Sequence, residues 1–372
     1  MKFIVGKTTL LDAVTMVGKC VPANNTVIPI LENFLFTLED SKLTIAGTDL
    51  LTTLITTLEV EGEGNIAIAI PSKILVELLK TLPDQPIEFM INAENNAICI
   101  TAGEGFFNLT GETSSDFPKI PVIETPSSFG LPAMVLADAI NKTLFAVSGD
   151  ELRPAMTGVL CSLGPDSMTF VATDARKLVR YIRKDTIAES KVDFILPKKA
   201  LSLLKSILPH EDVIVSIEYN KTSAFFNIRQ FRLICRLIDE AYPDYEAIVP
   251  KNNPNIVLVD RMLLINALNR VGVFSNKETH QVKLDIDSNR IIITAEDGDY
   301  SYNGKDSVEC QYTGTALTIG FNVKLLVELL KVLDTDQITI QMSGHNRPTL
   351  LFPFEGDESE ELMALAMPLM LN

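Results

Sequence analysis

The fold is decided by one stretch that the sequence carries three times, as PSKILVELLKTL at residues 71–82, PKKALSLLKSIL at 197–208 and NVKLLVELLKVL at 322–333. The early lysines that these copies share, Lys73, Lys199 and Lys324, are 126 and 125 residues apart. One third of the 372-residue chain is 124 residues. This agreement indicates three copies of one unit, and each copy has the apolar spacing of an amphipathic helix.

Two further features repeat with the same period. Polar turns between alternating apolar runs predict β-hairpins at 39–49, 164–174 and 287–297. Earlier helices are expected at Leu10–Val17, Leu136–Val147 and Leu263–Val273. Alternating runs such as 213–219 and 282–286 predict further strands. The period is longer than that of solenoid repeats, so the sequence predicts three α+β domains, each with two helices and many strands.

The domain boundaries follow from the linkers. Pro, Ser and Asn are enriched in 125–128 and 250–254. The predicted domains are therefore 1–125, 127–250 and 254–372. The repeat fixes this architecture but is equally compatible with a duplication that has no particular function.

Composition narrows the class of protein. The apolar fraction of 47% suits packed cores, and the net charge of −16 excludes a protein that binds nucleic acid with its whole surface. The five cysteines are scattered and contain no C-x-x-C, which is typical of a reducing compartment. No apolar run is long enough for a membrane span, and the N-terminal residues lack a signal-peptide pattern. We therefore expect a cytoplasmic protein without a membrane partner.

The basic residues gather on the predicted helices. The six helix windows together carry a net charge of +7, which leaves −23 for the rest of the chain. In the second helix of each repeat two lysines stand six or seven residues apart, on one face opposite the Leu/Ile stripe. This pattern favours a basic surface built from helices, although solvated helix faces are the simpler alternative.

Motifs for catalysis are lacking. Gly6-Lys7-Thr8 has no glycine five positions before it, as a phosphate loop requires. The three histidines have no partner at metal-ligand spacing. We expect the adjacent carboxylates at 150–151 and 239–240 to be exposed to solvent. We expect no enzyme activity, no metal and no cofactor.

The C-terminal segment LMALAMPLMLN is rich in methionine. Met363–Ala366 suits a core strand, whereas Pro368 cannot donate to a strand ladder. Methionine side chains are deformable and suit surfaces that accept several partners. The segment therefore predicts a strand followed by the lining of a groove.

Motifs spread over the whole chain resemble those of the bacterial DNA polymerase III β subunit family, the β sliding clamps. They are Gly149–Pro154 with Gly158–Leu160, Phe170–Asp174, Tyr242–Tyr245 with Pro250–Asn252, Gly320–Asn322 and Met367–Leu371. The resemblance implies three clamp-type domains, a head-to-tail homodimeric ring lined by helices, and a continuous outer sheet. It also implies a processivity factor of DNA replication, associated with the nucleoid, through which duplex DNA threads without sequence readout.

The resemblance further implies a hydrophobic groove for short peptides of the DNA polymerase III catalytic subunit, the clamp loader, other polymerases and repair factors. The matching groove positions are Met156, Thr173, Ala175, Arg176, Lys177, Leu178, Pro243, Ala247, Ile248, Asn322, Leu325, Leu365, Met367, Pro368, Leu369, Met370 and Leu371. The DNA-facing residues are Arg153, Lys198 and Lys199, with Lys205 added from the charge pattern. The dimer interface is expected at Phe107, Leu109, Val273 and Phe274.

Two other functions remain open at this point. One is an interaction scaffold that uses only the Met-rich groove and does not bind DNA. The other is an enzyme whose catalytic residues are too scattered to form a motif. Retention on circular DNA, and its loss when the circle is cut, separates a clamp from both.

Overall fold

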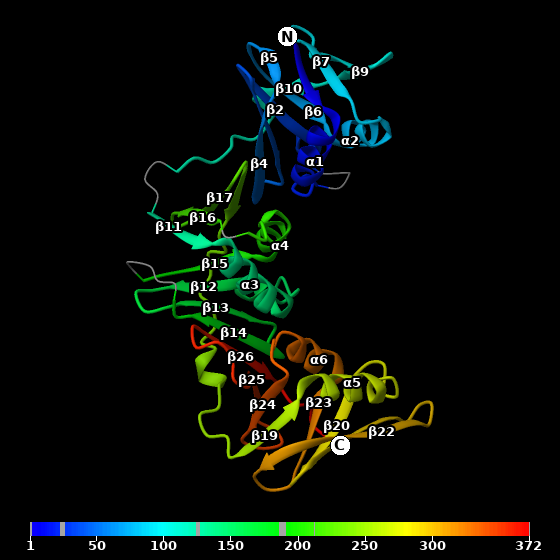
Figure 1. Cartoon of the computed structure of the whole chain (residues 1–372), viewed down its shortest axis with the longest axis vertical. Helices are drawn as coiled ribbons and strands as arrows, with labels where there is room; N and C mark the ends of the chain where they lie inside the picture. The colour runs from blue at the N-terminus through cyan, green and yellow to red at the C-terminus, as the bar shows by residue number, and fades with distance from the viewer. Residues whose placement is uncertain (1, 23–26, 124–126, 186–190, 212, 372) are drawn as a thin grey trace. The chain divides into compact units, whose positions relative to one another are not determined.

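A computed structural model describes residues 2–22, 27–123, 127–185, 191–211 and 213–371 (Figure 1). The chain forms two compact units. The first unit contains Met1–Ala137 and Lys199–Leu237, and the second contains Asp138–Lys198 and Ile238–Asn372. Both units therefore draw on the central repeat. The predicted domain ends at residues 125 and 372, and the linker residues Thr125 and Pro126, lie outside the described residues.

All six predicted helices are present. They are α1 (Lys7–Val17), α2 (Ser72–Thr81), α3 (Ala133–Thr143), α4 (Lys198–Ile207), α5 (Arg261–Gly272) and α6 (Val323–Lys331). The sequence pattern extended the third helix too far, because α3 ends at Thr143 and a 3-10 turn, η3 (Leu144–Ala146), follows it. Side-chain caps begin the last two helices, where Asp260 accepts from the backbone N–H of Leu263 and Asn322 from that of Leu325.

The described residues of the first unit form two antiparallel sheets. One has five strands in the spatial order β5 (Glu61–Glu63), β1 (Lys2–Gly6), β7 (Pro86–Asn92), β8 (Ala97–Ala102) and β9 (Gly105–Thr110). The other has nine strands in the order β10 (Glu112–Thr113), β6 (Asn65–Pro71), β2 (Asn33–Glu39), β3 (Lys42–Thr48), β4 (Thr52–Glu59), β18 (Phe231–Arg236), β17 (Ser223–Ile228), β16 (Ile214–Tyr219) and β11 (Ser127–Pro132).

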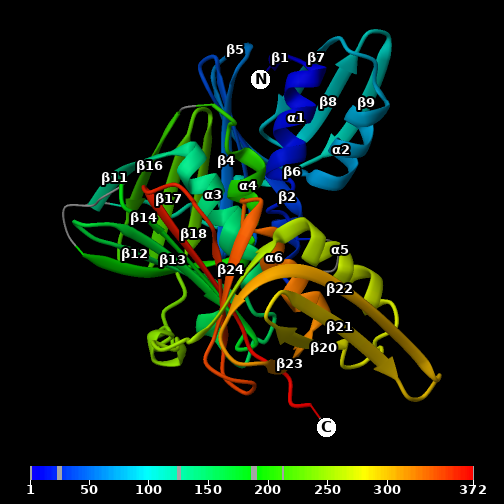
Figure 2. The same ribbon diagram turned by 60° about the horizontal axis from the view of Figure 1, so that its bottom comes forward.

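In the second unit, the part of the chain that the structure describes forms one antiparallel sheet of twelve strands. Their order is β15 (Val192–Pro197), β12 (Gly158–Leu163), β13 (Met168–Thr173), β14 (Lys177–Arg183), β26 (Glu360–Ala366), β25 (Thr349–Pro353), β24 (Gln337–Met342), β19 (Asn255–Asp260), β22 (Tyr302–Thr313), β21 (Arg290–Asp297), β20 (Gln281–Asp287) and β23 (Leu317–Asn322). Helices α5 and α6 lie side by side, and α5 also packs on β22 (Figures 1 and 2).

The large sheets do not stop where one repeat gives way to the next. Strand β4 of the first repeat pairs with β18 of the second, and β14 of the second pairs with β26 of the third. We call these pairings the first and the second strand junction. They make the sheets continuous from repeat to repeat, as expected for a clamp, and they explain why the compact units divide the central repeat.

The hairpin and strand predictions are confirmed. Hairpins join β2 to β3, β12 to β13 and β20 to β21. The expected strand Met363–Ala366 lies within β26 and is buried. The apolar faces of the helices contribute to the core. Leu10, Leu75 and Leu79, for example, are fully buried. No helix within the described parts of the chain is long and apolar enough to span a membrane.

Candidate functional site

A tight turn between β13 and β14 provides the frame of the predicted groove. The hydroxyl of Thr173 donates to the carbonyl oxygen of Lys177 at 2.8 Å and accepts from the backbone N–H of Ala175 at 3.1 Å. One carboxylate oxygen of Asp174 accepts from the backbone N–H groups of Arg176 and Lys177, both at 2.9 Å. Ala175 has a φ of 72°, in the left-handed region. Thr and Asp side chains thus fix the backbone that presents Ala175 and Arg176 to solvent.

The C-terminal segment lies directly against this turn. Across the second strand junction Leu178 pairs with Leu365. The backbone N–H of Met367 then donates to the carbonyl oxygen of Arg176 at 2.9 Å. Two residues later Leu369 donates to the carbonyl oxygen of Gly320 at 2.8 Å, at the end of β23. The structure therefore brings the turn, residues 367–371 and the start of α6 together, and Figure 2 shows this segment running past β23.

An apolar cluster lies beneath the turn. Its buried members are Val171, Leu178, Leu350, Met363 and Leu365. The partly buried residues Tyr242, Tyr245 and Val249 pack against it from the loop that precedes the third repeat. The Tyr242 hydroxyl donates to the carbonyl oxygen of Val171 at 3.2 Å, and burial raises the pKa of this phenol. Tyr242 therefore anchors the loop that carries the predicted groove residues Pro243, Ala247 and Ile248.

The predicted groove residues divide into a buried frame and an exposed rim. Thr173, Lys177, Leu178 and Leu365 are buried and hold the turn and strands in place. The exposed members are Ala175, Arg176, Ala247, Ile248, Met367 and Met370. Half-buried positions between them are Met156 in η4 (Pro154–Thr157), Pro243, Asn322, Leu325, Pro368, Leu369 and Leu371. The exposed side chains are mostly apolar, with Met370 at 72% and Ile248 at 45% exposure.

The charge of the Lys177 ammonium is paired within the protein. Its ammonium group lies 2.5 Å from a carboxylate oxygen of Glu328 and 3.9 Å from one of Asp174. It also lies 5.1 Å from the centre of the Phe145 ring. This residue therefore links the turn to α6 rather than presenting a free cation to a ligand.

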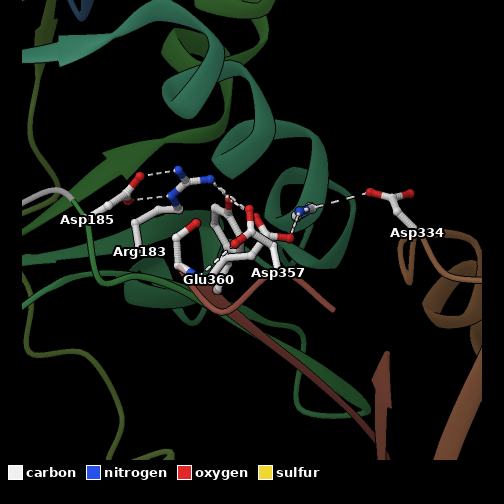
Figure 3. Close-up of polar contacts among 8 residues, drawn as sticks. Arg183, Asp185, Asp334, Asp357 and Glu360 are labelled. Carbon is white, nitrogen blue, oxygen red and sulfur yellow. Dashed lines mark hydrogen bonds and ion pairs between the residues drawn. The ribbon is translucent and has the colours of Figure 1, made fainter. Parts of the chain in front are cut away.

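A partly buried polar cluster crosses the second strand junction (Figure 3). Glu360 accepts from the Lys142 ammonium at 2.9 Å, the Tyr181 hydroxyl at 2.6 Å and the Arg183 guanidinium at 3.3 Å. Figure 3 shows Arg183 between Glu360 and Asp185, which it binds through two nitrogens. Burial would raise the pKa of Glu360, but hydrogen bonds from Tyr181 and Lys142 outweigh burial and lower that pKa. The sequence contained no local signal for this cluster, because Lys142 and Glu360 are 218 residues apart.

The predicted DNA-facing residues are all exposed. Arg153 precedes η4, and its Nε atom lies 3.4 Å from a carboxylate oxygen of Asp150. Lys198, Lys199 and Lys205 lie on α4. The Lys199 ammonium is 2.5 Å from a carboxylate oxygen of Asp49, so its charge is partly neutralised.

The predicted dimer-interface residues lie on strand edges or beside them. β9 is the last strand of its sheet, and Phe107 and Leu109 are half-buried on one face of it. In the second unit Val273 and Phe274 follow α5 with 77% and 41% exposure. The Phe274 ring lies against Gly304 in β22. Residues 302–309 of β22 pair with β21, whereas β19 pairs with 310–313, so within the described chain 302–309 have one unpaired edge.

Comparisons with known proteins point to one family along nearly the whole chain. The family models for the N-terminal, central and C-terminal domains of the DNA polymerase III beta subunit match residues 1–121, 130–244 and 246–369. The beta sliding clamp of Synechococcus elongatus is 27% identical over 380 residues, covering 100% of both chains.

Solved structures give the same result. The Bacillus subtilis DNA polymerase sliding clamp has 25% identity and a TM-score of 0.95. The Pseudomonas aeruginosa sliding clamp bound to griselimycin has 25% identity and a TM-score of 0.93. Both comparisons cover 100% of each chain.

Three repeated α+β units, joined by strand pairing into continuous antiparallel sheets, define a protein of the DNA clamp class. Within that class the chain belongs to the DNA polymerase III beta subunit family, the bacterial β sliding clamps.

Proposed function

We propose that two copies of this chain close into a ring around duplex DNA and act as a sliding clamp in replication. The ring holds DNA by its topology, reads no base sequence and catalyses no reaction. The observation that carries the proposal is the match to all three β subunit domains, in order, over nearly the whole chain. We place the protein in the cytoplasm, at the nucleoid, with domains 1–125, 127–250 and 254–372.

The charge distribution supports a sliding rather than a tightly bound complex. Arg153, Lys198, Lys199 and Lys205 are exposed cations on a chain of net charge −16. Each phosphate contact is weakened by salt, so a few cations attract DNA without fixing its position. The acidic remainder repels DNA from other surfaces. Because Asp49 neutralises Lys199 in part, we assign a larger share of DNA attraction to Lys205.

Two strand edges support closure of the ring between copies. The outer edge of β9 and residues 302–309 of β22 each carry unpaired backbone groups in the described chain. An antiparallel pairing between them would extend the sheets from one copy to the next. Phe107 and Leu109 of one copy would then pack against Val273 and Phe274 of the other.

The turn at 173–177 and residues 367–371 form our proposed partner groove. Apolar side chains of a short peptide would contact Ile248, Met367 and Met370, whose exposure leaves them available. The griselimycin complex of the P. aeruginosa clamp supports ligand binding by this class of protein. We expect peptides of the DNA polymerase III catalytic subunit, the clamp loader, other polymerases and repair factors to bind with about micromolar affinity.

Retention on DNA tests the proposed function. The protein is loaded onto a nicked circular plasmid, washed in high salt and then treated with a restriction enzyme that linearises the circle. We expect the protein to stay on the circle in high salt and to leave after cutting. Retention that does not change on linearisation contradicts topological binding.

A further inference from the structure

The first repeat contains a turn that matches the groove turn in every framing hydrogen bond. Between β3 and β4 the Thr48 hydroxyl donates to the carbonyl oxygen of Thr52 at 3.2 Å and accepts from the N–H of Leu50 at 3.1 Å. Asp49 accepts from the N–H groups of Leu51 and Thr52 at 3.0 and 2.7 Å. Leu50 has a φ of 76°, as Ala175 has 72°. We call residues 48–52 the first turn and 173–177 the second turn.

The segment that lies beside the first turn also makes the same backbone hydrogen bond as the segment beside the second turn. The backbone N–H of Arg236 donates to the carbonyl oxygen of Leu51 at 2.8 Å, as Met367 does to Arg176 at 2.9 Å. The β2–β3 pairing of Leu35 with Ala46 brings η1 (Pro29–Glu32) to the end of the sheet that holds the first turn. The frame of the proposed groove is therefore present twice.

The same frame does not recur in the third repeat. There the equivalent hairpin strand ends in Ala295, Glu296 and Asp297 rather than in a Thr-Asp pair. Asp297 is buried and accepts from the backbone N–H of Asp299 and the side chain of Asn276. The turn is thus a shared property of the two strand junctions and not of every repeat.

The first turn presents larger apolar side chains than the second turn. Leu50 and Leu51 are 53% and 58% exposed, where the second turn has Ala175 and Arg176. Ile28, just before η1, is 41% exposed. A leucine with positive φ is strained, and its exposure gives it no burial energy in return. A strained turn that exposes several apolar side chains has the properties expected of a binding surface.

The charges around the first turn select the ligand. Asp49 is already paired with the Lys199 ammonium at 2.5 Å, so it repels an anion less than a free carboxylate would. Arg236, the last residue of β18, lies beside Leu51 and is exposed. An apolar surface with a neighbouring cation is complementary to a peptide that has both large apolar residues and a carboxylate.

We propose that the first turn, with Ile28 and Arg236, is a second peptide-binding site. It takes short segments with two adjacent large apolar side chains and a carboxylate, and it binds them more weakly than the groove at the second turn. This inference rests on the proposed function, because it assigns the same class of partner segment to a second place. A partner with two such segments would then hold one chain at both sites and gain avidity.

Titration of the full chain with one labelled peptide tests this inference. The probe is fluorescein-Gln-Leu-Asp-Leu-Phe, followed by anisotropy, together with a photo-crosslinking form whose adducts are located by mass spectrometry. We expect a tight and a weak phase, the weak one at least about tenfold weaker, with adducts on residues 367–371 and 48–52 respectively. The double variant Leu50→Gly/Leu51→Ser should lower the weak affinity at least about tenfold and leave the tight phase unchanged.

The variants are chosen to keep the fold intact. Glycine suits the positive φ at position 50, so Leu50→Gly relieves strain. The matched control is Ile214→Ser, which removes a side chain of 59% exposure from β16 of the same unit and should change neither phase. When Asn replaces Asp in the probe peptide, the affinity of the weak phase should fall several-fold.

The outcomes separate this inference from the proposed function. A tight phase without a weak one, or adducts that avoid residues 48–52, contradicts the second site and leaves the clamp groove standing. If the unmodified chain shows no tight phase, the proposed groove at the second turn is wrong. If Leu50→Gly/Leu51→Ser changes the oligomeric mass in light scattering and leaves both phases unchanged, the surface binds a second copy, and the peptide site is wrong.

Discussion

The two strand junctions share a backbone plan but differ in their chemistry. At the first junction Thr52, Thr53 and Thr56 of β4 stand opposite Cys235, Ile234 and Phe231 of β18, and these threonines are buried. At the second junction charged groups cross from strand to strand. Arg183 pairs with Glu360, and Arg180 lies 2.6 Å from Glu361.

This difference shows that the two junctions share their strand pairing and the adjoining Thr-Asp turn, but not the side chains along the paired strands. Strand pairing is satisfied by N–H and C=O groups that every residue carries, so side chains on either face are free to differ. Small hydroxyl and apolar groups lie between the strands of the first junction, and ion pairs of a partly buried cluster cross the second. The two junctions should therefore respond to different perturbations.

Removal of residues 367–372 should have the largest effect, and only at the second junction. Strand β26 ends at Ala366, so the deletion keeps the pairing of β14 with β26 and removes only the backbone hydrogen bonds of Met367 and Leu369. The exposed residues Met367 and Met370 are lost, and we expect the tight phase of peptide binding to disappear, a loss of at least about 100-fold. Fluorescence anisotropy measures the affinity, and circular dichroism checks the fold. An unchanged affinity would remove the groove assignment.

The proposed junction between two copies should break when a charge is placed on β9. Phe107→Asp puts a carboxylate on the half-buried face of this edge strand, where desolvating it is costly. We expect monomers in multi-angle light scattering. Asn108→Asp, on the exposed face of the same strand, is the matched control and should remain dimeric. A persistent dimer in Phe107→Asp moves the interface elsewhere.

Loss of Glu360 should destabilise the second unit strongly. Glu360→Ala leaves the ammonium of Lys142, whose side chain is 9% exposed, without its nearest partner. Because Lys142 is buried and Glu360 is half-buried, we expect breaking this pair to cost up to about 3 kcal/mol of unfolding free energy. Urea unfolding followed by circular dichroism measures this cost.

Glu361→Ala is the control for that measurement. Glu361 pairs with Arg180 at the same junction, but its side chain is 40% exposed. We expect a loss below about 1 kcal/mol. Equal losses for Glu360→Ala and Glu361→Ala would show that the cluster adds nothing beyond surface pairing.

A substitution at the first junction should stabilise the protein, whereas the two substitutions at the second junction should destabilise it. The Thr56 hydroxyl is buried without a hydrogen-bond partner among the described residues. Thr56→Val removes this unsatisfied group and keeps the β-branched shape. We expect the free energy of unfolding of the first unit to rise by about 1 kcal/mol. A lower unfolding midpoint would show that the hydroxyl has a partner in solution.

Acid should weaken the second junction through Glu360. The folded-state pKa of Glu360 is lowered, so its charged form stabilises the fold above the unfolded-state pKa of about 4.3. That contribution is lost as pH falls from about 5 through the folded-state pKa. Urea midpoints between pH 7 and pH 4 should fall more steeply in the parent chain than in Glu360→Gln. Parallel curves would contradict this role of Glu360.

Sequence periodicity was sufficient for the helices and hairpins but not for the contacts between repeats. Apolar spacing placed α2, α4 and α6, and the alternation around Phe107 and Leu109 agrees with their shared face on β9. The Thr-Asp pairs at 48–49 and 173–174 were visible as the ends of matching hairpins, but their shared hydrogen bonds were not.

Long-range partners had no local signal. Tyr181 and Glu360 are 179 residues apart, and their contact depends on the pairing of β14 with β26. Pairing of strands from different repeats is decided by tertiary packing, which local apolar patterns do not encode. The exposure of Leu50 and Leu51 likewise became evident only from the fold.

Negative-stain electron microscopy of the purified protein tests directly whether this chain forms a ring. Class averages show whether the chains enclose a hole. We predict closed rings with a central opening, each of a size that fits two chains. Compact particles without a hole would contradict encirclement of DNA and leave only a repeat protein with peptide-binding turns.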